Sequence, residues 1–372
     1  MGKTPSRNRR EYWSGENIIW ISISDLSAVK SHVITNSKEH ITQLAVDETG
    51  IKPIPPNTVV MSFKLSIGKV AITTKISYTN EAIIAFLPKN NINISPLYLY
   101  YSLQSYDWSQ SGNRAVMGKT LNKATLKLLP FCLHAIDEQK QICAKLSLID
   151  AAISIKTNQL VKLDKLIKSQ FIELKHNKKQ KIMLLKNVCK IGSAKRVYHH
   201  ELRSVGEVPF FKVSDIVQLS NSISPSKKQF LSNETYNELV LEHAIPLPED
   251  ILITTRGTIG VSYKMKVNDK FYFQDGMVSW IRVLDKSLIS EFLSAYLQFE
   301  QCKLQMNKQS GSTVGYLSLK DLSNIQISYP DKLEQEKFIC FQHAVDKSKF
   351  VVQQSIEKLE LLKKSLMQQY FG

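Results

Sequence analysis

The sequence is poor in cysteine, and its few cysteines are scattered. The 372 residues include five of them, with no C-x-x-C pair: Cys132, Cys143, Cys189, Cys302 and Cys340. This spacing supports neither a disulfide framework nor a closed zinc site, and no histidine has partners at ligand spacing. We therefore expect no metal centre and a reduced protein of the cytoplasm.

Long hydrophobic runs and catalytic motifs are also missing. No apolar stretch approaches the roughly 18 residues of a membrane span, and the N-terminus lacks the apolar segment of a secretory signal. Residues 112–120 resemble a phosphate-binding P-loop, but five residues separate the glycines where four are needed. There is no Asn-Pro-Pro-Tyr motif and no glycine-rich cofactor loop after a strand. The sequence predicts a cytoplasmic protein that is not an enzyme and holds no cofactor.

Positive charge is present in excess. Lys and Arg number 49 against 33 Asp and Glu, a formal net charge of +16. Residues 1–190 carry 27 basic and 13 acidic side chains, whereas residues 191–372 carry 22 and 20. Such an excess favours a polyanionic partner, most commonly nucleic acid, although a membrane surface would also fit.

The second half of the sequence repeats the first. Short matches keep their order along the chain: residues 20–26 with 211–216, 56–68 with 248–260, 138–139 with 334–335, and 149–150 with 345–346. Their spacing, between about 190 and 199 residues, is far longer than the unit of a solenoid, which is about 20 to 50 residues. The repeat therefore indicates two copies of one domain, each with its connector.

Each copy begins with one pattern and ends with another. The first part is rich in β-branched and aromatic residues broken by turn formers, which predicts strands at 18–23, 58–63, 70–74 and 251–254. Residues 96–105 and 288–306 are predicted to be helical. The last part of each copy lacks Pro and Gly and has apolar residues at heptad spacing, which predicts a helix about 50 Å long.

The two heptad stripes predict buried seams. In copy one the stripe is Ile142, Leu146, Ile149, Ile153, Leu160, Leu163 and Ile167, with Lys156 as its polar member. In copy two it is Phe338, Phe341, Val345, Val352, Leu359, Leu362 and Leu366, with Ser348 and Ser355 between them. Each seam must be buried against the other long helix or, alternatively, against its own domain.

Repeat, heptads and local motifs together resemble the specificity subunit of type I restriction-modification systems, over essentially the whole chain. In that family each long helix begins near a Glu-Gln-x-x-Ile signature, here residues 138–142 and 334–338. The segments 2–6, 12–15 and 18–25 are similar to the start of many of its recognition domains.

The resemblance implies an α/β fold with two tandem target-recognition domains of mixed α/β structure, separated by two long helices that form an antiparallel coiled coil. The domains would cover residues 1–136 and 178–330, and the helices residues 137–177 and 331–372. The chain would read a bipartite, asymmetric DNA target without catalysing a reaction. Its implied partners are two methyltransferase subunits, which use S-adenosylmethionine, and restriction subunits, which use ATP and Mg.

Copy one departs from the repeat near both of its ends. Copy two has a strand-like lead-in at 182–191 before its equivalent of Gly2, and copy one has none. We therefore expect a shortened first domain with an unpaired sheet edge. Copy two keeps Pro330 before its long helix, where copy one has residues 132–135 without proline.

DNA recognition requires phosphate contacts that set the register and base contacts that read the sequence. Suitable side chains gather in loops at matching places of the two copies. The candidates are Lys3, Thr4, Ser6, Arg7, Arg9, Arg10, Lys64, Ser66, Lys69, Asn80, Arg114 and Lys119 in copy one, and Lys195, Arg196, Arg256, Thr258, Gln274, Lys308, Ser310 and Ser312 in copy two. A solvated loop is the competing interpretation for each residue alone, so the hypothesis depends on their recurrence.

The aligned candidates differ between the copies, which implies unlike half-sites. Lys64 falls opposite Thr255, Leu65 opposite Arg256, and Asn80 opposite Gln274. Two alternatives remain open from the sequence. One is the specificity subunit of a related system with a single fused restriction-methyltransferase partner, and the other is a noncatalytic coiled-coil protein that binds only proteins.

Overall fold

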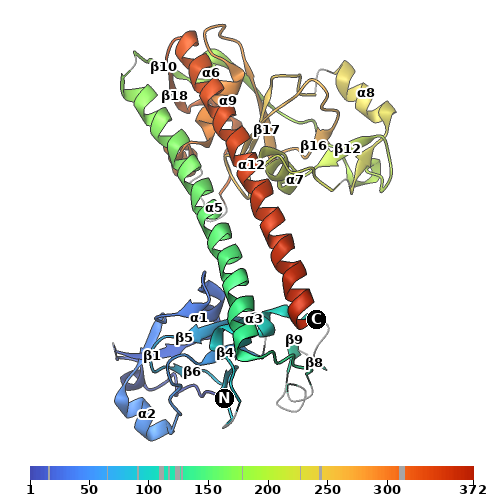
Figure 1. Cartoon of the computed structure of the whole chain (residues 1–372). Helices are drawn as coiled ribbons and strands as arrows, with labels where there is room; N and C mark the ends of the chain where they lie inside the picture. The colour runs from blue at the N-terminus through green and yellow to red at the C-terminus, as the bar shows by residue number, and fades with distance from the viewer. Residues whose placement is uncertain are drawn as a thin grey trace. The chain divides into compact units, whose positions relative to one another are not determined.

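The computed structural model describes residues 1–15, 17–64, 66–89, 92–108, 113–115, 118–121, 126, 129–177, 179–226, 228–242, 245–309 and 315–372. The chain forms two compact units, which we call unit 1 (Met1–Gln159 with Val352–Gly372) and unit 2 (Leu160–Val351). Two long helices, α5 (Ile136–Asn177) and α12 (Lys332–Phe371), each contribute a part to both units (Figure 1).

The described residues of unit 1 form two small mixed sheets, with strand orders β3-β1-β6 and β2-β5-β4-β7, and a hairpin, β8-β9. Its strands are β1 (Ile18–Ile21), β2 (Val33–Ile34), β3 (Glu39–Ile41), β4 (Val59–Ser62), β5 (Val70–Thr73), β6 (Tyr78–Thr79), β7 (Ile83–Phe86), β8 (Asn113–Ala115) and β9 (Gly118–Thr120). Its short helices are η1 (Arg10–Tyr12), α1 (Ile23–Ala28), α2 (Gln43–Thr49) and α3 (Pro96–Ser105).

The described residues of unit 2 form three sheets, with strand orders β11-β17-β14-β15, β13-β12-β16 and β10-β18. Its strands are β10 (Lys181–Leu184), β11 (Cys189–Ser193), β12 (Val208–Phe211), β13 (Phe230–Leu231), β14 (Ile251–Thr254), β15 (Ser262–Lys264), β16 (Tyr272–Phe273), β17 (Val278–Val283) and β18 (Gln326–Tyr329). Its short helices are α6 (Leu185–Val188), η2 (His199–Glu201), α7 (Val213–Ser220), α8 (Asn233–Leu241), α9 (Ser290–Gln298), α10 (Glu300–Gln309) and α11 (Leu319–Ser323).

Strand pairing confirms the duplication that the sequence predicts. β1 runs parallel to β6 and antiparallel to β3, and β12 has the same relation to β16 and β13. β4 lies antiparallel between β5 and β7, as β14 does between β15 and β17. The two units therefore share one mixed α/β scaffold.

The units differ at one sheet edge. In unit 2 the strand β11 covers the outer edge of β17, whereas among the described strands of unit 1 β7 has β4 as its one neighbour. The expected open edge of the first domain is present in this sense. The lead-in predicted as one strand at 182–191 is instead two strands around the helical turn α6, because Leu185 and Val188, three residues apart, both point into the core.

Other local predictions hold with adjusted ends. β4, β5, β14 and α3 lie where strands and a helix are expected, but β1 ends at Ile21 because the Ser22 hydroxyl caps α1 by accepting the Asp25 N–H. The helix expected at 288–306 is two helices, α9 and α10. The break comes at Phe299, whose ring stacks 3.6 Å from that of Phe171.

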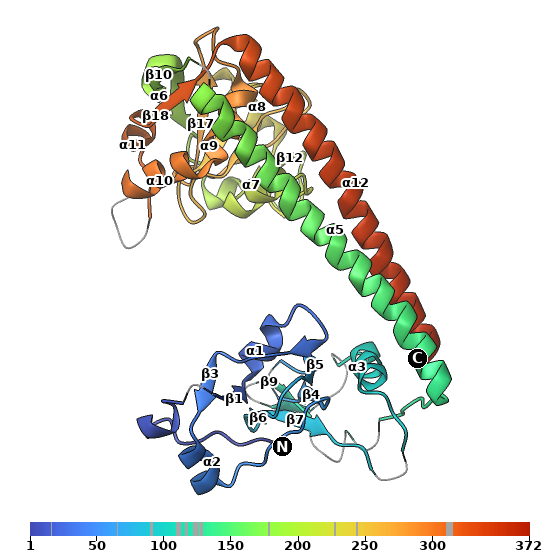
Figure 2. The ribbon, with the colours of Figure 1, turned by 60° about the vertical axis from the view of Figure 1, so that its left-hand side comes forward.

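Among the described residues, the largest of three hydrophobic clusters in unit 1 lies between its second sheet and the start of α5. Helix α3 packs on β4 and β5 (Figure 2) and buries Tyr98 and Tyr101 together with Ile142 and Leu146 of α5. The Tyr101 hydroxyl donates to Asp150 Oδ2 at 2.8 Å. The first turns of the long helix are thus part of the packed core of unit 1.

The glutamine of each Glu-Gln signature anchors the start of its long helix. Gln139 and Gln335 are fully buried, and each side chain makes three hydrogen bonds to main-chain groups. The partners of Gln139 are Ser95 N–H and the carbonyls of Asn93 and His134, and those of Gln335 are Ile289 N–H and the carbonyls of Ser287 and Pro330. The signature therefore has a structural role that is the same in both units.

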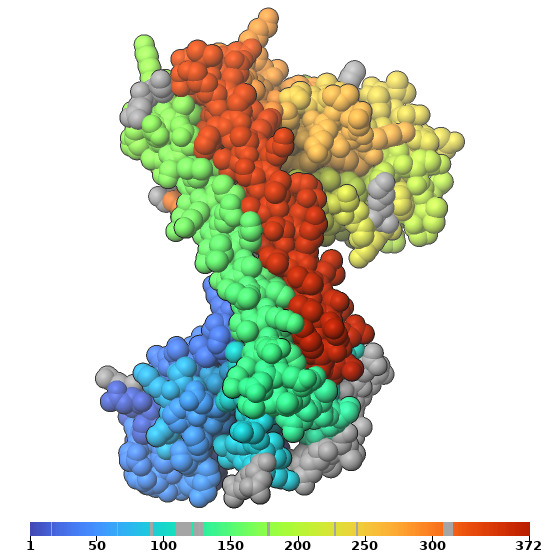
Figure 3. Space-filling view, in the orientation of Figure 1, coloured from blue at the N-terminus to red at the C-terminus, as the bar shows by residue number. Residues whose placement is uncertain are grey.

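The long helices pack against each other in each unit (Figure 3). The first part of α5 and the last part of α12 belong to unit 1, and the last part of α5 and the first part of α12 belong to unit 2. The two helices therefore run antiparallel. The seam of α12 differs from the predicted stripe. Ser348 and Leu362 are exposed, and Lys349, Ile356 and Lys363 occupy the seam instead. After Val345, Val352 and Leu359 the next seam residue comes four positions later, whereas the predicted stripe places it three positions later.

The two seam lysines have acidic partners on α5. The spacing of apolar residues alone therefore predicts the wrong positions for the seam of α12. Lys363 Nζ lies 2.6 Å from Asp150 Oδ1 in unit 1. Lys349 Nζ lies 2.8 Å from Asp164 Oδ1 in unit 2. A half-buried lysine is tolerated at such a position when a carboxylate satisfies its charge and its stem packs on the neighbouring helix.

Candidate nucleic-acid interface

Three segments with predicted DNA-binding residues meet around the turn between β6 and β7 in unit 1. Three main-chain hydrogen bonds join them: Gly2 N–H to Ile83 O (3.3 Å), Lys3 N–H to Thr79 O (2.8 Å) and Phe63 N–H to Ala82 O (3.0 Å). A fourth bond, from Leu121 N–H to Phe63 O (2.9 Å), connects the set to the residue that follows β9. The Thr4 hydroxyl also donates to the Glu81 carboxylate. We call this set, the described residues 2–10, 63–64, 66–69 and 79–83, loop cluster 1.

The same connections recur in unit 2. Thr255 N–H donates to Met277 O (2.8 Å), and Leu317 N–H donates to Thr255 O (2.9 Å). Gln274 N–H bonds Phe211 O at 3.0 Å, as Asn80 N–H bonds Ile21 O at 3.1 Å in unit 1. We call residues 193–200, 255–261 and 272–277 loop cluster 2, and it is the structural counterpart of loop cluster 1.

A buried hydroxyl shapes the central turn of each cluster. Ser62 Oγ donates to Ser66 O and accepts Lys69 N–H at 3.0 Å. Thr254 Oγ1 donates to Thr258 O and accepts Val261 N–H, also at 3.0 Å. These bonds hold the two turns in the same backbone conformation. The exposed residues of one turn therefore lie at places equivalent to those of the other.

A glycine with positive φ closes each of these turns. The φ angle is +82° at Gly68 and +80° at Gly260. A Cβ atom at Gly68 would come within 2.2 Å of the Trp108 ring, and one at Gly260 within 2.8 Å of Met306 Sδ. Glycine is required here both for the left-handed backbone and for the close approach.

The matched bonds correct one pairing made from the sequence. Because Ser62 corresponds to Thr254, Lys64 corresponds to Arg256, and the pairing of Lys64 with Thr255 and of Leu65 with Arg256 is wrong by one residue. Both cations lie over an aromatic ring: Lys64 Nζ is 5.5 Å from the Phe63 ring centroid and the Arg256 guanidinium is 4.8 Å from that of Tyr316. The pairing of Asn80 with Gln274 agrees with their matched main-chain bonds.

The arginines of the N-terminal segment differ in their surroundings. Arg7 is ion-paired with Glu39, and its guanidinium lies 3.8 Å from the Trp13 ring centroid. The hydrogen bond from Arg7 lowers the pKa of Glu39. Arg9 is ion-paired with Glu11 and Glu48. Arg10 is exposed at the start of η1. A phosphate that bound Arg7 or Arg9 would therefore compete with carboxylates already beside them.

Loop cluster 2 has a similar first segment. Lys195 Nζ is ion-paired with Glu242 at 2.6 Å, which raises the pKa of this lysine. The Arg196 guanidinium lies 5.3 Å from the Tyr198 ring centroid. The Tyr272 hydroxyl holds the segment by accepting Lys195 N–H at 2.8 Å.

The other candidates fall at several places. Lys3 Nζ donates to Thr49 O at 2.6 Å, Ser6 O accepts the Trp13 indole N–H at 3.0 Å, and Ser66, Lys69 and Thr258 are exposed. Arg114 and Lys119 face each other in the β8-β9 register, and Lys308 lies in α10. The side chains of these last three, and the whole of Ser310 and Ser312, lie outside the described residues. All candidates stay predictions as DNA contacts.

Sequence reasoning missed the groups that support these cations. Trp13, Tyr198 and Tyr316 each lie beside an arginine guanidinium. The signal was visible for Tyr198, which stands two residues after Arg196, but Tyr316 reaches Arg256 only through an isolated β-bridge. The face of an aromatic ring can hold a guanidinium in place while the N–H groups of the guanidinium stay available as hydrogen-bond donors.

Comparison with known proteins identifies the family. The family described as "Type I restriction modification DNA specificity domain" matches residues 1–165 and 177–361. This chain belongs to that family, the specificity subunits of type I restriction-modification systems. It is 26% identical over 365 residues to the type I restriction enzyme MjaIX specificity subunit of Methanocaldococcus jannaschii, which covers 91% of this chain and 82% of that protein.

Further relatives match part of this specificity subunit or its fold. The EcoR124I/EcoR124II specificity subunit of Escherichia coli is 26% identical over 176 residues, 46% of this chain and 43% of that protein. The type I S subunit from M. genitalium superposes with a TM-score of 0.52 at 14% identity, covering 100% of this chain and 92% of that one. A structure of a type I R-M system complex gives 0.61 at 16% identity, covering 95% and 91%. At these identities the two structures show the shared fold.

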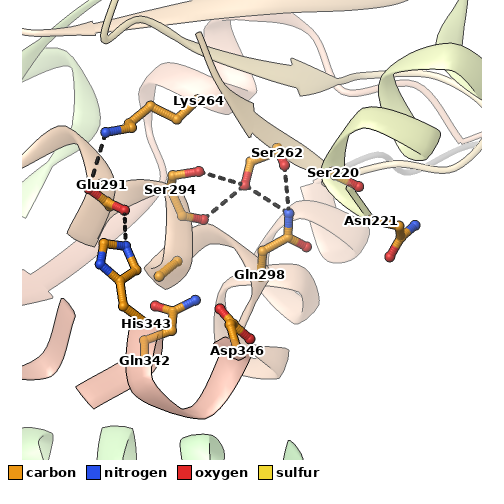
Figure 4. A pocket seen from close by; sticks show the side chains of 11 residues that line it. Ser220, Asn221, Ser262, Lys264, Glu291, Ser294, Gln298, Gln342, His343 and Asp346 are labelled. Atoms are coloured by element: carbon orange, nitrogen blue, oxygen red, sulfur yellow. Dashed lines mark hydrogen bonds and ion pairs between the residues drawn. The ribbon is translucent and has the colours of Figure 1, made fainter. Parts of the chain in front are cut away.

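The specificity subunit also has a polar cavity of about 320 Å³ in unit 2 (Figure 4). Glu291 accepts bonds there from Lys264 Nζ (3.1 Å) and His343 Nε2 (2.6 Å), and Gln298 Nε2 donates to Ser262 Oγ (2.8 Å). Burial would raise the pKa of Glu291, but the bonds from His343 and Lys264 outweigh it and lower the pKa. These contacts tie α12 to α9 and β15.

Clusters of metal-ligand side chains and long apolar helices are both missing from the described part of the chain. No group of three or more His, Cys, Asp or Glu side chains among the described residues could hold a metal ion. No described helix is long and apolar enough to cross a membrane.

Proposed function

We propose that this specificity subunit reads a bipartite, asymmetric DNA target, with loop cluster 1 on one half-site and loop cluster 2 on the other. The observation that carries the proposal is the duplicated turn, in which matched bonds from Ser62 and Thr254 hold Lys64 and Arg256 at equivalent places. A repeated scaffold with unlike exposed side chains suits the reading of two unlike sequences.

The cations divide into two groups in this proposal. Arg256 can donate two parallel hydrogen bonds to the edge of a guanine, whereas Lys64 offers a single ammonium, so the half-sites would differ at this position. The exposed Lys and Arg of residues 3–10 and 195–196 would contact phosphates and set the register. Ten lysines between positions 156 and 190 could add phosphate contacts.

The reaction chemistry would belong to other subunits. We propose two methyltransferase subunits using S-adenosylmethionine and restriction subunits using ATP and Mg as partners, with a noncatalytic role for this chain. The absence of a P-loop and of a methyltransferase motif from the sequence supports this division.

Methylome sequencing of a strain that lacks only this gene tests the proposal. A bipartite motif with a nonspecific gap should lose its methylation, and the wild-type gene should restore it. Complementation with R256A should relax the motif in one half, and K64A should relax it in the other half. A methylome that does not change on deletion would contradict the proposal, as would loss of marks at a single continuous motif.

A further inference from the structure

The contact between Arg256 and Tyr316 lies at the surface of unit 2. The Arg256 guanidinium is 4.8 Å from the Tyr316 ring centroid. Both residues are exposed, and Tyr316 keeps 39% of its surface accessible. Arg256 belongs to loop cluster 2, whereas Tyr316 comes from the segment just before α11. The fold thus joins a candidate base-reading side chain to a ring from a distant part of the chain.

Main-chain bonds place the ring beside the guanidinium. Arg256 and Tyr316 face each other in an isolated antiparallel bridge, and Leu317 N–H donates to Thr255 O at 2.9 Å. Leu317 and Thr255 are 1% and 2% exposed, so this bond is anchored inside unit 2. On the other side of Arg256 the turn is held by the Thr254 hydroxyl. The backbone on both sides of the contact is therefore fixed before any ligand binds.

Arg256 differs from most of the described arginines that lie over a ring. Arg7, Arg9 and Arg282 lie over Trp or Tyr rings, and each is also ion-paired with a carboxylate. Arg256, like Arg196, has a ring but neither an ion pair nor a side-chain hydrogen bond with another described residue. The N–H groups of Arg256 are therefore available to an external acceptor while the ring already restrains the guanidinium.

Unit 1 carries a different pair of residues at the same place. The bond from Leu317 N–H in unit 2 corresponds to the bond from Leu121 N–H in unit 1, which is also 2.9 Å long. Thr120 therefore stands in the chain where unit 2 has Tyr316, and the cation of that turn is Lys64. The ring accompanies the arginine and is replaced by threonine where the cation is lysine. A planar guanidinium gains more from a ring that fixes its plane than an ammonium on a flexible stem does.

We propose that Tyr316 is a positioning residue for base recognition by unit 2. Its ring restrains the Arg256 guanidinium, which then donates two parallel hydrogen bonds to the edge of a guanine. Restraint before binding reduces the side-chain entropy that Arg256 loses when it meets the base. The effect requires the ring face and not the Tyr316 hydroxyl. This proposal rests on the DNA-reading role proposed for loop cluster 2, and it adds a determinant of specificity outside that cluster.

Equilibrium binding of the assembled complex to DNA duplexes tests the positioning role. The duplexes carry the motif that methylome sequencing defines, with one base pair substituted at a time. Arg256→Ala should lower discrimination at one base pair by at least about five-fold, which identifies the base pair that this arginine reads. Tyr316→Leu keeps an apolar side chain but removes the ring, and it should lower discrimination at the same base pair by about two- to five-fold. Tyr316→Phe keeps the ring face and should discriminate as the wild type does.

A double variant and a matched control separate positioning from other roles. Because Tyr316 acts through Arg256, the double variant Arg256→Ala with Tyr316→Leu should discriminate no worse than Arg256→Ala alone. Tyr198→Leu removes the ring beside Arg196, a candidate phosphate contact, and should leave discrimination at every single base pair unchanged. Circular dichroism and thermal melting verify that all variants fold.

The outcomes distinguish failure of the positioning role from failure of the DNA-reading role. If Arg256→Ala left discrimination unchanged at every base pair, base reading by Arg256 would be wrong and the positioning role would fall with it. If Arg256→Ala relaxed one base pair and Tyr316→Leu did not, the positioning role alone would be overturned.

Three further results would also overturn the positioning role. Equal loss in Tyr316→Phe and Tyr316→Leu would assign the effect to the hydroxyl. A further loss in the double variant, beyond that of Arg256→Ala, would make Tyr316 a DNA contact in its own right. Equal weakening on all duplexes by Tyr316→Leu would show that the ring supports the fold of unit 2 and not the reading of one base pair.

Discussion

Unit 1 and unit 2 share the same buried hydrogen bonds but differ in the side chains that they expose and in one sheet edge. The buried glutamine, the turn hydroxyl and the turn glycine have counterparts at matching places in both units. The side chains displayed outside this frame differ, and so does the sheet edge, which β11 covers in unit 2 alone among described strands. Buried polar groups with satisfied hydrogen bonds therefore set the frame that the two units share. The exposed positions of each turn take no part in these bonds, so their side chains can differ between the units.

The largest effect should come from breaking the shared frame. Gln139→Leu or Gln335→Leu leaves one N–H and two carbonyls without the bonds that the amide supplies. Each change should lower the unfolding free energy of its own unit by about 3 kcal/mol, since a buried unsatisfied polar group costs about 1 to 3 kcal/mol. Hydrogen exchange read separately in the two units measures this.

The matched control is Gln141→Leu, an exposed position on the same helix as Gln139. It should change stability by less than about 0.5 kcal/mol. If Gln139→Leu and Gln335→Leu differed by more than about 1.5 kcal/mol, the two units would not share an equivalent frame.

The sequence predicted the larger features of this molecule because they depend on periodicity. The repeat, the long helices and the strands around residues 59–62 and 251–254 follow from patterns that local chemistry enforces. The seam of α12 was misplaced because Lys349 and Lys363 are half-buried against Asp164 and Asp150. A carboxylate partner distant in sequence cannot be seen from heptad spacing.

Prediction of the candidate interface was limited in a similar way. The loops were found, but the pairing of Lys64 and Arg256 required the hydrogen bonds of Ser62 and Thr254. Ion pairs such as Arg7 with Glu39 join residues far apart in sequence and depend on tertiary structure. The sequence therefore found which segments carry charge, and the structure was needed to show which charges already have partners.

A second prediction tests whether the unlike turns read unlike half-sites. Arg256→Ala should reduce discrimination by about 1 to 3 kcal/mol at one base position of one half-site, because a bidentate base contact is lost. Lys64→Ala should act on the other half-site only. Binding of the assembled complex to duplexes substituted at each position measures both. Equal weakening on specific and random duplexes would instead make either residue a phosphate contact.

A third prediction uses the covered edge of unit 2. Lys181 Nζ lies 2.6 Å from Asp285 Oδ2, and bonds from Lys181 and Ser287 lower the pKa of Asp285 far below its usual range. A carboxyl with a lowered folded-state pKa stabilises the fold above its unfolded pKa, and this contribution is lost as the pH falls through the folded value. Unit 2 should therefore lose stability below about pH 4.

Asp285→Asn should flatten this acid dependence and cost unit 2 about 1 to 2 kcal/mol at neutral pH. Asp47→Asn, at an exposed carboxylate of α2 in unit 1, is the control and should change neither quantity. Urea unfolding between pH 3 and pH 7, followed by exchange within each unit, measures the profile. If unit 2 of the Asp285→Asn variant still lost stability below about pH 4, another carboxylate would be responsible for the acid dependence.

The smallest effect should separate cations that differ in their partners. Arg10 is exposed, whereas Arg9 in unit 1 and Lys195 in unit 2 are ion-paired with glutamates. If Arg10 contacts a phosphate, Arg10→Ala should reduce the slope of log K against log salt by about 0.9, on specific and random duplexes alike. Arg9→Ala and Lys195→Ala should each change the slope less, because neighbouring carboxylates already offset part of the charge of these side chains. Replacing Arg7, Arg9 and Arg10 together should flatten the slope most, and a triple variant that keeps the wild-type slope would remove the N-terminal segment from the phosphate-binding surface.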